Sequence, residues 1–138
     1  MKTQNSITYD SSISDYLING KSLLEHLKIH EDIEPKSYMP AIIAQFDTVD
    51  RLLGIAEPDL IKNRIAIYLC GHCGGYDGNP IGIKIETSEN TVSWSEIGFY
   101  SDFDESHCIP FEKVSKFTFD LNEYNEFLKT LRIYEIKA

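Results

Sequence analysis

The sequence lacks several features that would place it in a particular class of protein. Its 138 residues contain no run of roughly 18 or more apolar residues, so no segment predicts a transmembrane helix. Residues 1–6 are mostly polar and lead into no apolar segment of the kind found in secretory signals. We therefore expect a soluble protein that stays in the cytoplasm.

Clusters of basic residues are also missing. The chain has 13 lysines and arginines against 22 aspartates and glutamates, so its formal net charge is −9. This charge repels a nucleic-acid backbone and an anionic membrane surface, so we expect no nucleic-acid partner and no membrane partner. An acidic surface suits rapid docking to a basic protein, although many cytosolic proteins are acidic without such a role.

Cysteine is scarce, and the number is odd. Three cysteines do not fit the disulfide framework of a secreted domain, and they agree with a reducing compartment. Cys70-Gly71-His72-Cys73 is nevertheless the tetrapeptide found in the active sites of protein disulfide isomerases. Such an enzyme needs a helix that begins at the motif and stabilises the thiolate. Here residues 74–80 are turn formers, which argues against redox catalysis.

A zinc site is the alternative for the same cysteines. Cys70 and Cys73 would form one half of such a site, and His107 and Cys108 would supply the rest. The adjacent His107 and Cys108 cannot both point at one ion without strain. The simpler interpretation is that the thiols are small, partly buried apolar groups near a hairpin tip.

No other catalytic pattern appears in the chain. The glycine-rich residues 74–78 lack the Gly-Lys-Ser/Thr of a phosphate-binding loop, and neither HExxH nor Gly-x-Ser-x-Gly occurs. His26 and His30 lie four positions apart, but a solvated helix face explains them better than a metal pair. We therefore expect a binding protein that is not an enzyme, without a cofactor unless zinc occupies the cysteines.

The pattern of apolar residues predicts an α+β fold, as a single domain over residues 1–138. Strands are predicted at 6–9, 15–18, 64–69, 81–85, 91–100 and 117–119. Helices are predicted after the Ser22–Glu25 capping box, over 41–53 before Gly54, and after Asp120, with a loop over 31–40. Strands flanked by helices at both ends of the chain are typical of an antiparallel sheet with helices packed on one face.

The same pattern makes two sharper predictions. In the strand over 91–100 the apolar phase changes between Trp94 and Ile97. This change predicts a bulge or bend near Ser95 and Glu96. The residues that we expect to be largely buried are Leu24, Leu27, Ile65, Ile67, Ile83, Trp94, Phe117, Phe119, Phe127 and Leu131.

Acidic residues surround an aromatic residue in the segment over 101–106. In an interface with a basic partner, the ring supplies buried area and the carboxylates steer association. The first candidates for partner contacts are therefore Asp102, Phe103, Asp104 and Glu105. The second candidates are Tyr76 and Asp77 in the hairpin loop, with Glu96 and Tyr100 if the bulged strand presents them outward. Two ordinary solvated loops are the alternative interpretation.

Several short motifs follow one another in roughly the last two-thirds of the chain. They are Asp50-Arg51-Leu52-Leu53-Gly54, Arg64 to Leu69, Cys70-x-x-Cys73-Gly74, Gly82 to Glu86, Val92-x-Trp94, and Phe117-x-Phe119-Asp120 with Tyr124. Their order resembles that of a family of small uncharacterised bacterial proteins. In that family the loop often continues to a third cysteine, whose place is taken here by residues around Gly78. The resemblance implies a fold and is nearly silent about function.

A second resemblance is one of type. A short, acidic chain without a catalytic constellation is similar to the immunity proteins of contact-dependent growth inhibition and other polymorphic toxin systems. Those proteins bind the C-terminal toxin domain, commonly a basic nuclease, and block its active site or an essential surface. The resemblance implies a protein partner, namely a basic toxin domain.

Overall fold

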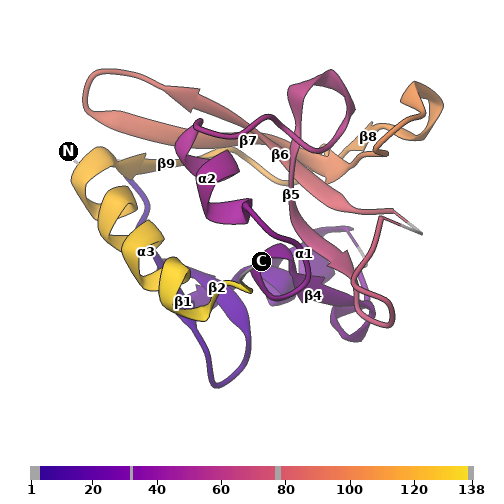
Figure 1. Cartoon of the computed structure of the whole chain (residues 1–138), viewed down its shortest axis with the longest axis horizontal. Coiled ribbons are helices and arrows are strands. Elements are labelled where there is room, and N and C mark those ends of the chain that lie inside the picture. Colours follow the sequence, from indigo (N-terminus) through magenta and orange to yellow (C-terminus); the bar gives the residue numbers. More distant parts are fainter. Residues whose placement is uncertain (1–3, 32, 77–78, 137–138) are drawn as a thin grey trace.

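A computed structural model describes residues 4–31, 33–76 and 79–136 and confirms the predicted α+β fold (Figure 1). Within these residues two antiparallel sheets occur with three α-helices. The smaller sheet contains β1 (Ile7–Asp10), β2 (Asp15–Ile18) and β3 (Lys21–Ser22). The larger sheet contains β4 (Tyr38–Pro40), β5 (Ile65–Cys70), β6 (Ile81–Thr87), β7 (Thr91–Phe99), β8 (Ile109–Pro110) and β9 (Phe117–Asp120). The helices are α1 (Leu23–Glu31), α2 (Thr48–Leu53) and α3 (Leu121–Tyr134).

The smaller sheet is an antiparallel meander of β1, β2 and β3. Asn19 and Gly20 form the turn between β2 and β3, with positive φ angles of 54° and 78°. Asn-Gly tolerates these angles better than other residue pairs, which explains the tight turn. The Ser22 hydroxyl oxygen then accepts from the backbone N–H of Glu25 at 3.1 Å. This bond caps the first turn of α1 as the sequence predicts.

Asp15, at the start of β2, is a buried carboxylate with four hydrogen-bond donors. Its Oδ1 accepts from the backbone N–H of Tyr16 at 2.8 Å and from the hydroxyl of Tyr68. Its Oδ2 accepts from the hydroxyl of Ser22 and from the backbone N–H of Leu24 at 3.2 Å. These donors lie on β2, β3, α1 and β5, so this one side chain joins the two sheets and the start of a helix.

The N-terminal strand is bonded to the last elements of the chain. The backbone N–H of Asn5 donates to the carbonyl oxygen of Thr118 at 2.6 Å. The backbone N–H of Ile7 donates to Oε1 of Glu123 at 3.1 Å. As a result β1 lies beside α3 (Figure 1).

The larger sheet has the strand order β4-β5-β6-β7-β8, and β9 also pairs with β7. Gly82 of β6 pairs with Gly98 of β7. Lys84, two positions after Gly82 on β6, pairs with Ser95, three positions before Gly98 on β7. Between these two pairs, one residue of β6 therefore faces two residues of β7. Glu96, within this bulge, has a positive φ of 48°. The predicted bulge is confirmed.

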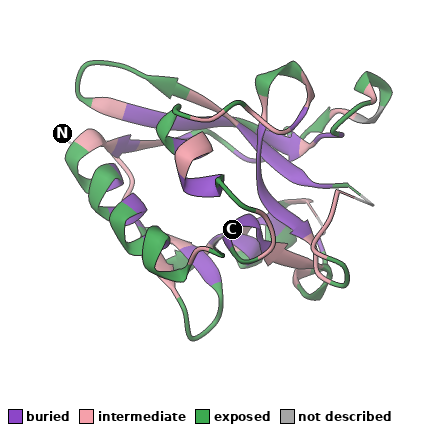
Figure 2. Ribbon diagram, in the orientation of Figure 1, coloured by how far each residue is buried: buried purple, intermediate pink, exposed green. Residues whose placement is uncertain are grey.

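The main core lies between the larger sheet on one side and the smaller sheet with the three helices on the other. Trp94 of β7 is fully buried, and its Nε1 donates to the hydroxyl of Tyr124 at 3.2 Å. The Tyr124 hydroxyl in turn donates to the carbonyl oxygen of Leu52 in α2 at 3.1 Å, so the buried polar groups are satisfied. Every residue that the sequence predicts to be largely buried is buried, which confirms that prediction (Figure 2).

Two predictions about the segment before β5 are wrong. The residues over 31–40 are not only a loop, because Tyr38–Pro40 forms the edge strand β4. The residues over 41–53 are not one helix, because a 3-10 helix at Ala41–Ile43 precedes α2. Asp47 separates the two with a left-handed backbone (φ 65°) that a continuous α-helix cannot accommodate. Gly54, with φ 83°, ends α2 as predicted.

Candidate functional site

The acidic segment over 101–106 forms a turn directly after β7. Ser101 is buried, and its carbonyl oxygen accepts from the backbone N–H of Ile61 at 3.0 Å. Its hydroxyl oxygen accepts from the backbone N–H groups of Phe103 at 3.1 Å and Asp104 at 3.0 Å. Bonds of this kind fix a turn locally. Ser101 therefore sets the direction in which the segment leaves the sheet.

The side chains of this turn differ in their exposure to solvent. Asp104 is half-buried, and its Oδ1 accepts from the backbone N–H and the hydroxyl of Ser106 at 2.9 and 2.7 Å. This pair of bonds caps the short 3-10 helix Glu105–His107. Phe103 is 80% exposed, and Asp102 and Glu105 are exposed as well. One aromatic ring and two carboxylates thus face solvent, while Asp104 holds the turn.

Tyr76 of the hairpin loop and the two residues that flank the acidic turn, Tyr100 and Cys108, belong to or pack on one small apolar cluster. Its buried members are Ala41, Leu60, Ala66, Leu69 and Tyr100. Tyr76, from the loop after β5, and Cys108, from the segment after the acidic turn, both pack against this cluster. The structure therefore brings the second loop to the same end of the larger sheet as the acidic turn.

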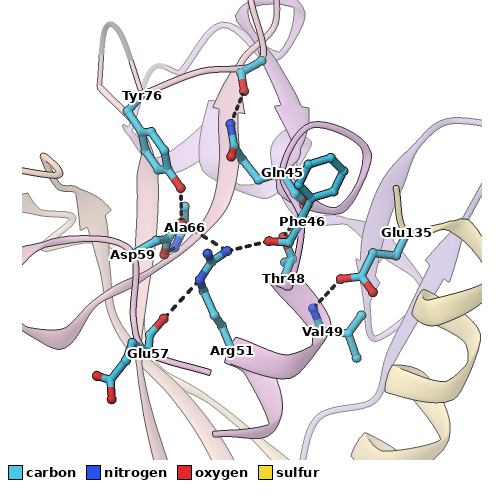
Figure 3. Close-up of polar contacts among 11 residues, drawn as sticks. Gln45, Phe46, Thr48, Val49, Arg51, Glu57, Asp59, Ala66, Tyr76 and Glu135 are labelled. Atoms are coloured by element: carbon cyan, nitrogen blue, oxygen red, sulfur yellow. Dashed lines mark hydrogen bonds and ion pairs between the residues drawn. The ribbon is translucent and has the colours of Figure 1, made fainter. Parts of the chain in front are cut away.

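Tyr76 is half-buried and directed inward. Its hydroxyl donates to Oδ2 of Asp59 at 2.8 Å (Figure 3). Burial, followed by the carboxylate of Asp59, raises the pKa of Tyr76 well above its ordinary value, and the charge of Asp102 adds to the rise. Tyr76 is thus a neutral donor that positions its loop. Asp77 lies outside the described residues.

Asp59 is the centre of a polar network that joins three loops (Figure 3). Its Oδ1 accepts from the backbone N–H of Ala66 at 2.9 Å, and its Oδ2 lies 4.0 Å from Nη1 of Arg51. Arg51 also donates to the carbonyl oxygens of Glu57 at 3.1 Å and Phe46 at 2.9 Å. The loops under the acidic turn are consequently tied to β5 and to α2.

Tyr100 does not meet the condition under which it would be a candidate for partner contacts, because the strand does not present it outward. Tyr100 is only 2% exposed, its hydroxyl donates to the carbonyl oxygen of Glu96 at 2.6 Å, and the Arg64 guanidinium lies 5.2 Å from its ring centroid. The apolar cluster covers this part of the sheet on the face away from the main core, so a side chain that leaves the core is buried again. Glu96 is exposed, but its carboxylate lies 2.8 Å from Nη2 of Arg64 and 3.7 Å from Nζ of Lys84.

The three cysteines lie at the end of a strand, in a turn and against the apolar cluster. β5 ends at Cys70, and no helix begins in the described residues 71–76, so the helical context of a thiol–disulfide enzyme is not present there. Cys73 is exposed, whereas Cys108 is half-buried against the apolar cluster. Among the described residues no group of three or more His, Cys, Asp or Glu side chains is arranged to hold a metal ion. The side chain of His107 lies outside the described part of the structure.

Comparison with known proteins adds no relative from which a function would follow. No protein-family model, curated protein or solved structure matches the chain. In the parts of the chain that the structure describes, no helix is long and apolar enough to cross a membrane. The resemblances drawn from the sequence thus remain expectations.

Proposed function

We propose that this protein is a cytoplasmic immunity protein, which binds a bacterial toxin domain and blocks it without catalysing a reaction. The observation that carries the proposal is the acidic turn, in which an 80% exposed Phe103 lies between the exposed carboxylates of Asp102 and Glu105. The net charge of −9 supports a basic partner, since opposite charges accelerate and orient association.

The aromatic ring is the proposed centre of the interface. Aromatic side chains that enter a pocket on the partner dominate binding energy in protein–protein interfaces. An exposed Phe has a large apolar area to lose, and here the turn that carries it is already fixed by Ser101. A pre-organised turn loses little conformational freedom on binding, which improves affinity.

The remaining candidates receive different roles in this proposal. Asp102 and Glu105 steer a basic partner and form the polar rim around Phe103. Asp104 and Tyr76 act indirectly, because the first caps the turn and the second fixes the loop beneath it. Glu96 is a weaker candidate because two cations already surround its carboxylate, and the buried Tyr100 supports the surface from below.

A growth assay tests the proposal directly. The C-terminal domain encoded by the gene immediately upstream would be induced in a test bacterium, with and without this protein. We expect the domain to stop growth and this protein to restore it. A Phe103→Ala variant should restore growth poorly, whereas the matched Ile133→Ala variant, whose side chain is 73% exposed on α3, should protect fully. A harmless upstream domain, or toxicity that persists beside folded protein, would contradict this pairing.

A further inference from the structure

Helix α1 places two imidazole rings side by side on adjacent turns. The ring centroids of His26 and His30 lie 4.5 Å apart, with an angle of 53° between the ring planes. Residues four apart in a helix share one face, which explains the contact. His30 is exposed, whereas His26 is half-buried with its ring 5.7 Å from that of Phe117 in β9. The sheet therefore restricts one ring of the pair and leaves the other open to solvent.

The spacing of the two rings suits a shared metal ion. A transition-metal ion binds an imidazole nitrogen at about 2.0–2.1 Å, which places the ion about 3.2 Å from the ring centroid. Two rings that bind one ion at right angles then have centroids about 4.5 Å apart. The observed separation of 4.5 Å equals this value. The helix therefore holds the two rings at a separation that allows both to bind one ion.

We propose that His26 and His30 form a two-ligand site for a divalent transition-metal ion of the copper and nickel class, whose ligands commonly stand at right angles. Imidazole suits both ions, and copper binds such ligands more tightly than nickel does. In the part of the chain that the structure describes, no group of three or more ligating side chains is found, so the ion keeps positions for water or for a ligand of another molecule. The site lies on α1, and its existence does not depend on the proposed binding of a toxin.

A nickel titration followed by NMR spectroscopy tests the site residue by residue. We expect the paramagnetic ion to broaden the imidazole resonances of His26 and His30 before those of His72, which lies beside the cysteines. The His30→Gln variant should lose affinity on the order of 100-fold, because two linked ligands bind much more tightly than one. His30 is exposed, so this variant should keep the wild-type circular dichroism spectrum.

Two matched variants distinguish nickel binding by the His26–His30 pair from the general attraction of cations to an acidic protein. His30→Gln combined with Glu31→His keeps the number of histidines but moves the second ring off the shared helix face, so it should stay weak. His72→Gln should bind nickel as the wild type does. Equal affinity in the wild type and in His30→Gln, or broadening that begins at His72, would overturn the proposal.

Discussion

Two groups of carboxylates in this protein lie in opposite surroundings. Asp15 is buried and accepts four hydrogen bonds from protein groups, and Asp59 likewise accepts from a backbone N–H and a tyrosine hydroxyl. Asp102 and Glu105, by contrast, are exposed beside Phe103. The comparison shows that the carboxylates behind the net charge of −9 belong to two groups. Carboxylates of the first group hold strands and loops together, and only the exposed carboxylates of the second group are available to attract a partner.

The largest expected effect comes from exchanging an acid of the first group. Asp15→Asn puts an amide NH₂ where hydrogen-bond donors now meet a carboxylate, and we expect a loss of about 3 kcal/mol in the free energy of unfolding. Urea denaturation followed by circular dichroism would measure it. The matched Asp102→Asn variant should stay within about 0.5 kcal/mol of the wild type. Equal losses in both variants would remove the distinction between the two groups.

The next effect concerns binding rather than stability. Once the growth assay supplies the toxin domain, Phe103→Ala should lose about 2 kcal/mol or more of binding free energy, as a central aromatic residue does. Isothermal titration calorimetry would measure the loss, with Ile133→Ala as the control. Unfolding of Phe103→Ala should match that of the wild type because the ring is exposed. Unchanged affinity would place the interface elsewhere on the molecule.

A smaller effect should follow from the loop beneath the acidic turn. Tyr76→Phe removes one hydrogen bond to the carboxylate of Asp59, which should cost about 1–2 kcal/mol of unfolding free energy. Thermal and urea unfolding would measure the change. Tyr134→Phe, on an exposed tyrosine, is the matched control and should show little change. If Tyr76→Phe unfolds like the wild type, the Asp59 network does not stabilise this loop.

The smallest effect concerns the rate of association. Asp102→Asn with Glu105→Gln removes two exposed charges and should slow association with a basic partner up to roughly tenfold at low salt. The difference should shrink at high salt, because exposed charges are screened, and the dissociation rate should change little. Stopped-flow measurements would test this against Glu89→Gln with Glu112→Gln, which removes two exposed charges elsewhere. Equal slowing in both pairs would indicate general attraction instead of steering by the turn.

Local patterns predicted much of the fold. The change of apolar phase after Trp94 identified the bulge, because alternation reports directly which face of a strand is buried. The start of α3 after Asp120 was equally predictable, because it depends on a bond between residues three positions apart, from the backbone N–H of Glu123 to the carboxylate of Asp120. Strand β4 was missed because three residues that end in proline carry too short a pattern.

Only part of the candidate site could be predicted from the sequence. Exposure of Phe103 agrees with the expectation from its acidic neighbours. The burial of Tyr100 did not follow from its strand, because it depends on a second apolar cluster whose members come from distant segments. Asp59 gave no signal at all, since its partner Tyr76 lies 17 positions away and no local motif joins them. Contacts of this kind are set by tertiary packing, which a single sequence does not display.

The bonds that Asn5 and Ile7 make also determine when the fold can be completed. Ile7 needs Glu123, which lies 116 positions later, and Asn5 needs Thr118. Contacts between residues so far apart in sequence slow folding, because a long chain must close before the contact gives any stabilisation. During synthesis the docking of the smaller sheet onto β9 and α3 therefore has to wait until these two elements have left the ribosome. We expect the backbone N–H groups of Asn5 and Ile7 to become protected from hydrogen exchange only after Thr118 and Glu123 have been synthesised.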